Sequence, residues 1–161
     1  MGTAAIDTSQ LVVFVVDGQR YALPLAAVDR VVRSVAVTLL PDAPAIILGV
    51  INVQGRVVPV IDLRRRFHLE ERPMEVEDHL IVAESSTGTV ALPVDEAQGL
   101  IRNLNGESVP AGDIVPNLNY VDQVFLYGPE MVFVLDIDTV LTDDEELALA
   151  DSLRGLDGAD D

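Results

Sequence analysis

The segment Ile46–Phe67, IILGVINVQGRVVPVIDLRRRF, decides the fold of this chain. It holds an apolar run, a turn at Gln54-Gly55 and a second apolar run that ends at Asp62. A Gly-containing turn between two β-branched runs predicts a tight hairpin with strands over Val50–Val53 and Val57–Ile61. Valine, isoleucine, asparagine and glycine supply packing area and backbone hydrogen bonds, but they supply no nucleophile. The segment therefore predicts a surface for recognition rather than a catalytic site.

Short β-type runs separated by turn residues continue on both sides of this hairpin, which is the spacing of small barrels. Before it, the pattern predicts strands at Leu11–Val16, Arg20–Ala22 and Val28–Val35, and helical turns at Pro24–Ala27 and Pro41–Leu48. After it, the pattern predicts strands at His79–Glu84, Thr87–Val94, Ala97–Leu100, Val121–Leu126 and Met131–Leu135. Thr142 and Glu145 form a capping-box pattern, which predicts a helix over about 142–154.

The strand count predicts a mainly β fold of two five-stranded barrels, because five strands suffice to close a small barrel that hides its own edges. The first barrel is expected over about residues 10–65 and the second over about 76–136, within one domain of residues 10–154. Residues 1–9 and 155–161 are expected to be flexible tails.

Composition narrows the functional classes. The chain has 161 residues, 49% of them hydrophobic, and a formal net charge of −17. No apolar run approaches the roughly 20 residues that a membrane helix needs, so membrane insertion is not expected. The first ten residues lack both a basic start and an apolar core, and cysteine is absent, so a cytoplasmic protein is expected. The negative charge repels phosphate backbones and anionic lipids, which disfavours nucleic-acid binding.

Histidines and acids do not form a recognisable catalytic or metal-binding pattern. His68 and His79 are the only histidines, and their spacing fits no ligand pair. The acids between Asp136 and Glu145 resemble a calcium loop only superficially, because apolar residues interrupt the run and it contains no glycine. Asp62, Asp95 and Asp136 each follow an apolar strand, which turn chemistry explains. The sequence therefore predicts a protein without a cofactor, a metal or enzymatic activity.

A family resemblance rests on several motifs in order. Gly49–Arg64, GVINVQGRVVPVIDLR, resembles the segment G-V-x-N-[LV]-R-G-x-[VI]-[VI]-P-[VI]-x-[DN]-L of CheW, the chemotaxis adaptor. Tyr21–Val28 resembles the opening hairpin of that family, Ala91–Asp95 resembles its G-[IVL]-x-V-D strand, and Met131–Ile137 resembles its last strand. The resemblance covers roughly residues 10–149, and it implies two five-stranded SH3-like barrels packed together.

The resemblance also implies partners, because the family couples chemoreceptors to the histidine kinase CheA without catalysing a reaction. It implies that the regulatory domain of the kinase docks on apolar residues of the first barrel, which here are Val12, Leu25, Val28 and Val31. It implies that the cytoplasmic tip of a chemoreceptor lies in the groove between the barrels, against Ile51, Asn52, Gln54, Leu80 and Leu100.

Two positions depart from the family pattern. Gln54 replaces the usual arginine before the turn glycine, and Glu96 stands where a glycine is common. Arg56 is two residues after Gln54 and is a candidate substitute for the missing charge. A related scaffold in a non-flagellar chemosensory array is therefore a second hypothesis. A small-molecule-binding or enzymatic β-barrel is an alternative from another class, which an enclosed pocket with converging carboxylates would favour.

Overall fold

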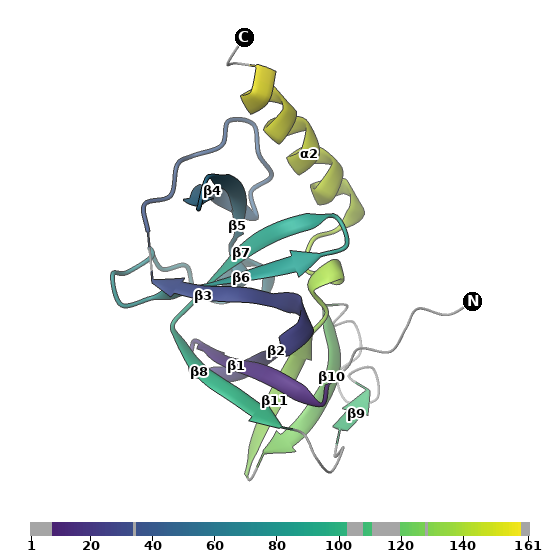
Figure 1. Ribbon diagram of the computed structural model, residues 1–161. Helices are drawn as coiled ribbons and strands as arrows, with labels where there is room; N and C mark the ends of the chain where they lie inside the picture. Colours follow the sequence, from purple (N-terminus) through teal and green to yellow (C-terminus); the bar gives the residue numbers. More distant parts are fainter. Residues whose placement is uncertain (1–7, 34, 103–107, 111–119, 128, 159–161) are drawn as a thin grey trace, which may run out of the picture.

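The computed structural model describes residues 8–33, 35–102, 108–110, 120–127 and 129–158 (Figure 1). These described residues are mainly β, and they include two short 3-10 turns, a one-turn helix and a longer C-terminal helix. The strands are β1 (Gln10–Val16), β2 (Gln19–Pro24), β3 (Val28–Arg33), β4 (Ile47–Val53), β5 (Arg56–Ile61), β6 (His79–Ser85), β7 (Gly88–Val94), β8 (Glu96–Arg102), β9 (Ser108–Pro110), β10 (Val121–Tyr127) and β11 (Glu130–Leu135). The helical elements are η1 (Leu25–Ala27), α1 (Leu63–Arg66), η3 (Ile137–Thr139) and α2 (Asp143–Gly158).

The strands form two sheets. One sheet has the order β8-β1-β2-β11-β10-β9, and the other has the order β3-β6-β7-β5-β4. Neighbours pair antiparallel, except that β2 pairs with β11 and β5 pairs with β7 in parallel. Figure 1 shows the six-stranded sheet below and the five-stranded sheet above, with α2 beside the latter.

The ten predicted strands are present, but their expected grouping into barrels is wrong. A first barrel over about 10–65 and a second over about 76–136 would place β1 and β2 with β3, β4 and β5. Instead, β1 and β2 pair with β8 and β11, while β3, β4 and β5 pair with β6 and β7. The reason is that the chain crosses between the sheets at η1 and again after β7. The sheets are therefore made from non-contiguous parts of the sequence.

The buried apolar residues described form three clusters that stabilise the two sheets. The largest lies between them, because it includes Phe14 and Leu23 of one sheet and Ile81 and Leu92 of the other. Two smaller clusters each belong to one sheet: one is centred on Leu80 and Val58, and the other on Leu11 and Val134. Several strands are therefore apolar on both faces, as the runs of valine and isoleucine in the sequence indicate.

The hairpin turns follow local chemistry. Gln54 and Gly55 have φ values of 50° and 86°, and the Gly55 N–H donates to Asn52 Oδ1 at 2.7 Å. Two consecutive residues with positive φ are the requirement of a two-residue type I′ turn, which matches the right-handed twist of the strands. The predicted hairpin is confirmed, with β4 starting earlier than expected, at Ile47.

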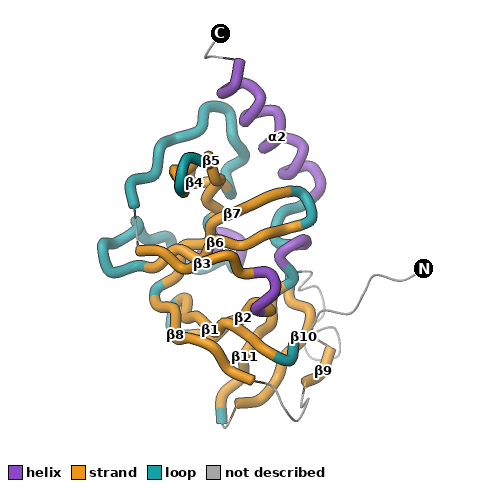
Figure 2. Tube along the Cα trace, viewed as in Figure 1, coloured by secondary structure: helices purple, strands orange, loops and turns teal. Residues whose placement is uncertain are grey.

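Two helix predictions have different outcomes. Thr142 and Glu145 form a reciprocal capping box, since the Thr142 N–H donates to Glu145 Oε1 at 2.8 Å and the Glu145 N–H donates to Thr142 Oγ1 at 3.2 Å. The helix α2 that follows is longer than predicted and ends at Gly158. The helix expected at Pro41–Leu48 is wrong: isolated turns lead into β4, and Asp42 has a φ of 62°, which a helix does not allow. Figure 2 shows this segment as a loop.

Candidate functional site

The predicted kinase-contact residues lie mainly on one strip at the edge of the five-stranded sheet. Leu25 is on η1, and Val28 and Val31 are on β3, an edge strand that pairs with β6 alone among the described strands. Leu25 and Val31 are exposed, with 41% of the surface of Val31 accessible, and Val28 is half-buried against the central core. We call Leu25, Val28 and Val31 the β3 strip.

A β-bulge lets Val28 and Val31 share one face. Residues three apart on a regular strand point to opposite faces. The register of β3 against β6 shifts between Val28 and Arg30, so that Val28 pairs with Ala83 and Val31 pairs with Ile81. Because Ala83 and Ile81 are two residues apart, they point to the same face, and cross-strand partners follow them. The strip is thus a consequence of the bulge.

Val12, the fourth predicted kinase contact, lies elsewhere. It is buried in β1 of the other sheet, where it pairs with Leu100 of β8. It does not join the β3 strip. Val35, which sequence reasoning did not single out, is an exposed apolar residue two positions after the end of β3. Its signal in the sequence is the β-branched run Val28–Val35, which by itself predicts only a strand.

The predicted receptor-contact residues do not form one surface. Asn52 and Gln54 are exposed at the β4–β5 turn. Ile51 and Leu80 are buried in the core of the five-stranded sheet, and Leu80 has no accessible surface, so the expectation that they contact a receptor directly is wrong. Strand alternation explains this, since Ile51 points inward where Asn52 points outward.

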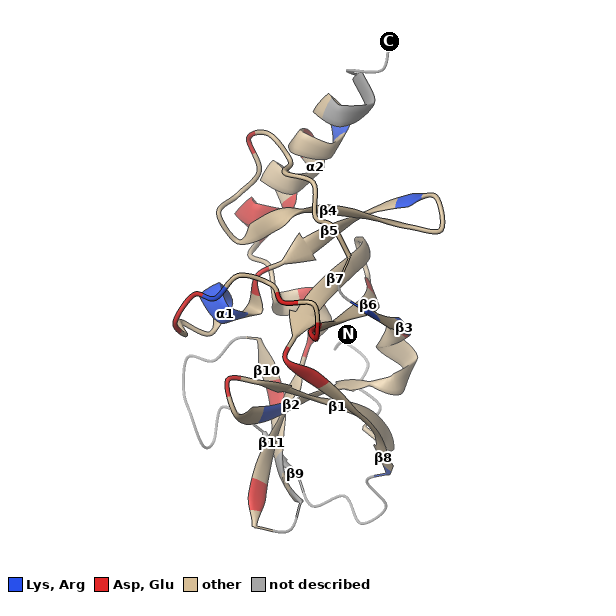
Figure 3. Cartoon of the chain, turned by 90° about the vertical axis from the view of Figure 1, so that its left-hand side faces the viewer, with Lys and Arg blue, Asp and Glu red and all other residues tan. Residues whose placement is uncertain are grey.

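Leu100 is exposed, but it lies on β8, the edge strand of the other sheet. Figures 1 and 3 show β8 in the lower half of the molecule and the β4–β5 hairpin in the upper half. Of the predicted receptor contacts, Asn52 and Gln54 therefore remain together as an exposed pair.

Arg56 is engaged away from the turn residue Gln54. Its guanidinium Nη2 lies 3.6 Å from Glu84 Oε1 of β6 and 4.0 Å from Asp29 Oδ2 of β3. These ion pairs link the β4–β5 hairpin to the strand that carries the β3 strip. The structure therefore assigns Arg56 to Asp29 and Glu84, and not to the charge that the family pattern has at position 54. Figure 3 shows where the basic and acidic residues lie along the chain, with basic residues gathered at α1.

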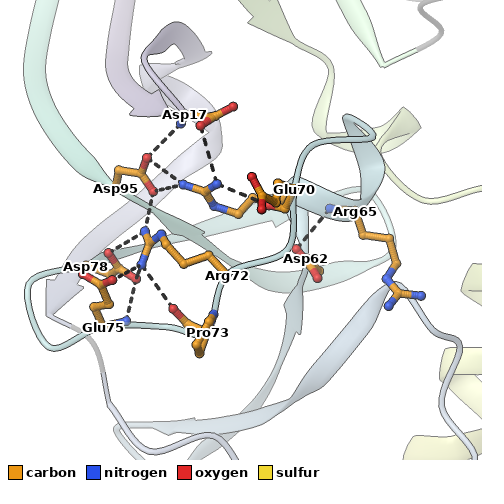
Figure 4. A network of polar contacts seen from close by, with 10 residues as sticks. Asp17, Asp62, Arg65, Glu70, Arg72, Pro73, Glu75, Asp78 and Asp95 are labelled. Carbon is orange, nitrogen blue, oxygen red and sulfur yellow. Dashed lines mark hydrogen bonds and ion pairs between the residues drawn. The ribbon is translucent and has the colours of Figure 1, made fainter.

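A network of hydrogen bonds and ion pairs around Asp95 connects the two sheets (Figure 4). Asp95, between β7 and β8, accepts two hydrogen bonds from Arg64 Nη2 at 2.8 and 2.9 Å and one from Arg72 Nη2 at 2.6 Å. It also accepts the backbone N–H of Asp17, in the β1–β2 turn, at 2.8 Å. Arg72 also donates to buried Asp78, at 3.0 and 3.2 Å. The carboxylate of Asp95 thus joins one hairpin of the six-stranded sheet to α1 and β7.

The pKa of Asp95 follows from this geometry. Burial by itself raises the pKa of the carboxyl, but the hydrogen bonds from Arg64, from the Asp17 N–H and from Arg72 outweigh burial and hold the pKa below its ordinary value. The pKa of Arg72 is raised, chiefly by its hydrogen bonds to Asp78. Asp95 and Asp78 are therefore satisfied structural carboxylates: Asp95 has two arginine partners and Asp78 has one.

The network around Asp95 predicts how the free energy of unfolding depends on pH. Asp95→Asn is expected to lower the free energy of unfolding at neutral pH by about 2 kcal/mol, because hydrogen bonds to a charged group are lost. Since the pKa of Asp95 is lowered on folding, its contribution is complete above the unfolded value of 3.8 and is lost as the pH falls through the folded value. Urea unfolding at several pH values measures the difference in the free energy of unfolding between Asp95→Asn and the parent. This difference should be constant around neutral pH and should become smaller below about pH 4.

Glu71→Gln is the matched control for Asp95→Asn. Glu71 pairs with Arg65 at an exposed position, so its replacement should change the free energy of unfolding by less than about 0.5 kcal/mol. An equal loss of stability in both variants, or a difference for Asp95→Asn that does not narrow in acid, would contradict the role given to Asp95.

Three comparisons with known proteins agree with this architecture. The family model described as the CheW-like domain matches residues 10–145. The chain is 32% identical to the chemotaxis protein CheW of Bacillus subtilis over 142 residues, which cover 86% of this chain and 91% of that protein. The chain belongs to the CheW-like family.

Other members of the family extend the comparison. The chemotaxis protein CheW of Rhizobium meliloti is 27% identical over 141 residues, covering 86% of this chain and 91% of that protein. The crystal structure of the scaffolding protein TtCheW from Thermoanaerobacter tengcongensis has the same fold, with a TM-score of 0.78 and 24% identity over 86% of this chain and 96% of that one. The resemblance seen in the motifs is thus confirmed, and chemotaxis coupling is the function of the family.

Within the part of the chain that the structure describes, no group of three or more His, Cys, Asp or Glu residues could hold a metal ion. In the same described residues, no helix is both long enough and apolar enough to span a bilayer.

Proposed function

We propose that the chain is a non-catalytic adaptor that acts in the cytoplasm and links the cytoplasmic tips of chemoreceptors to the regulatory domain of the histidine kinase CheA. The observation that carries the proposal is the β3 strip, an apolar strip on an edge strand, in a chain that belongs to the CheW-like family. Exposed aliphatic side chains on a rigid strand suit a partner that is itself folded, because little ordering is needed on binding.

The β4–β5 turn is the proposed contact with the receptor. Asn52 and Gln54 are exposed there, and the turn is held by the hydrogen bond between Gly55 and Asn52. Such a turn offers polar contacts at fixed positions, which suits a helical hairpin that already has its own apolar contacts. A scaffold of a non-flagellar array would use the same two surfaces, with different receptors.

Isothermal titration tests the proposal. The purified chain is titrated with the regulatory domain of CheA and, separately, with a receptor cytoplasmic hairpin, both from the same organism. We expect a complex with each, in the micromolar range that is typical of transient signalling contacts. The absence of a complex with either partner would refute the adaptor function.

A substitution at position 54 tests the proposed receptor contact directly. Gln54→Arg restores the residue of the family pattern, and we expect it to tighten receptor binding by up to about tenfold, as a charge-assisted hydrogen bond does. Gln10→Arg, which adds the same charge at an exposed position on β1, is the control for simple attraction to the acidic chain. If both variants gain equally, or if neither gains, residue 54 does not contact the receptor.

A further inference from the structure

An apolar groove lies between α2 and the five-stranded sheet. It adjoins the β4–β5 turn, because its lining residue Val57 is the cross-strand partner of Asn52. It has a volume of about 630 Å³. Buried side chains from both elements, such as Ile61, Val90 and Leu149, line it. Two exposed side chains face it from its two sides: Val57 of β5, with 54% of its surface accessible, and Leu147 of α2, with 67%.

Contacts at two positions along α2 fix the helix beside the groove. At its start, Glu145 pairs with Arg66 of α1, and Glu146 accepts a hydrogen bond from Thr87 at 3.3 Å. Further along, Ser152 donates to the carbonyl of Asp42 at 3.0 Å. Figure 1 shows the start of α2 beside the tip of the β6–β7 hairpin, with the helix running away from the sheets from there. Because α2 is fixed at both positions, the exposed Leu147 is not free to fold down and fill the groove.

The topology decides how a partner can bind in this groove. β5 lies between β7 and β4, and β7 lies between β6 and β5, so neither strand has a free edge. A partner cannot therefore add a strand here, and must bind through side chains. A groove with apolar walls on a helix and a strand suits a second helix that presents residues at i, i+3 or i+4, and i+7.

The charge around the groove indicates the polar part of that helix. Asp143 and Glu146 lie among the lining residues, on the first turn of α2. Arg56 is the one basic residue among the described residues that line it, and it already faces Asp29 and Glu84. The groove therefore keeps a surplus of negative charge, which lysine or arginine on a partner would balance.

We propose that the groove between α2 and the β5 and β7 strands is a third docking surface, and that it binds an amphipathic helix of another protein with an apolar face and basic residues at one end. Its lining includes none of the β3 strip residues and neither Asn52 nor Gln54, although it borders the β4–β5 turn through Val57. The test below uses neither kinase nor receptor, so failure of this proposal is distinguishable from failure of the proposed function.

A designed peptide tests the proposal without a known partner. The probe is a fluorescent helical peptide with leucine along one face, two lysines at one end, and alanine and glutamine elsewhere. We expect it to bind the full chain with a dissociation constant between about 10 and 100 μM in fluorescence anisotropy, at physiological ionic strength. Replacing its lysines by glutamate should weaken binding at least about tenfold, because like charges then meet at the groove.

Variants of the chain locate the binding site. Leu147→Lys and Val57→Lys place a charge on each wall, and each should weaken binding at least about tenfold. Leu126→Lys is the control, because Leu126 is 57% accessible on β10 and outside the groove. We expect circular dichroism and thermal unfolding of the variants to match those of the parent chain, because the substituted side chains are exposed.

Several results would overturn the proposal. Absence of peptide binding would do so, and so would equal weakening by Leu126→Lys, which would indicate attraction to the acidic chain alone. Sedimentation velocity provides the remaining check: if the parent chain self-associates and Leu147→Lys abolishes this association, a second copy of the chain occupies the groove instead.

Discussion

Replacing Val31 by glutamate is expected to weaken binding of the kinase regulatory domain by about 100-fold, equivalent to about 2.7 kcal/mol, because a charge enters an apolar contact and must be desolvated there. Val31 is the better position for this test than Val28. Val28 packs against the central core, so a charge there would also lower the stability of the fold. Val31 is exposed, so Val31→Glu should keep the thermal stability of the parent.

Titration of the regulatory domain into both proteins measures the effect, and Val76→Glu is the control. Val76 is a highly exposed valine in the loop between α1 and β6. Val76→Glu therefore adds the same charge at a position outside the β3 strip. Equal affinities of Val31→Glu and the parent would show that the kinase binds elsewhere. A loss in both variants would indicate that added negative charge, and not the strip, weakens binding.

Replacing Gly49 by alanine is expected to lower the free energy of unfolding by about 3 kcal/mol. Gly49 has a φ of 153°, and a Cβ atom there would lie 2.3 Å from the carbonyl oxygen of Thr38. That oxygen accepts the Val50 N–H at 2.8 Å, and the Thr38 N–H donates to the Val50 carbonyl at 2.9 Å. The close contact can be relieved only by moving Thr38, which breaks the bridge that covers the outer edge of β4.

Gly55→Ala is the matched control for Gly49→Ala. Gly55 also has a positive φ, of 86°, but a Cβ atom there would meet nothing within 4 Å. Its replacement should cost only the backbone strain, about 1 kcal/mol. Urea unfolding of the two variants compares the costs. Equal costs would mean that the contact with Thr38 is unimportant, and that strain alone makes glycine necessary at position 49.

The amino-acid sequence by itself determined the local elements. Positive φ at Asp17-Gly18 and Gln54-Gly55 makes the β1–β2 and β4–β5 turns, and the hydroxyl of Thr142 with the carboxylate of Glu145 starts α2. These features involve residues within a few positions of each other, so residue type is sufficient to predict them. The family was visible for the same reason, because its motifs are these hairpins and strands in order.

Only the tertiary structure decided which strands share a sheet and which apolar residues remain exposed. The parallel pairing of β2 with β11 joins segments more than 100 positions apart. The residues of neither segment indicate which other strand it pairs with. Valine and isoleucine look alike in the core and on a binding surface, so Leu80 and Val31 could not be distinguished before strand order and the β3 bulge were known. Burial depends on what packs against a side chain, and the packing partners come from distant parts of the chain.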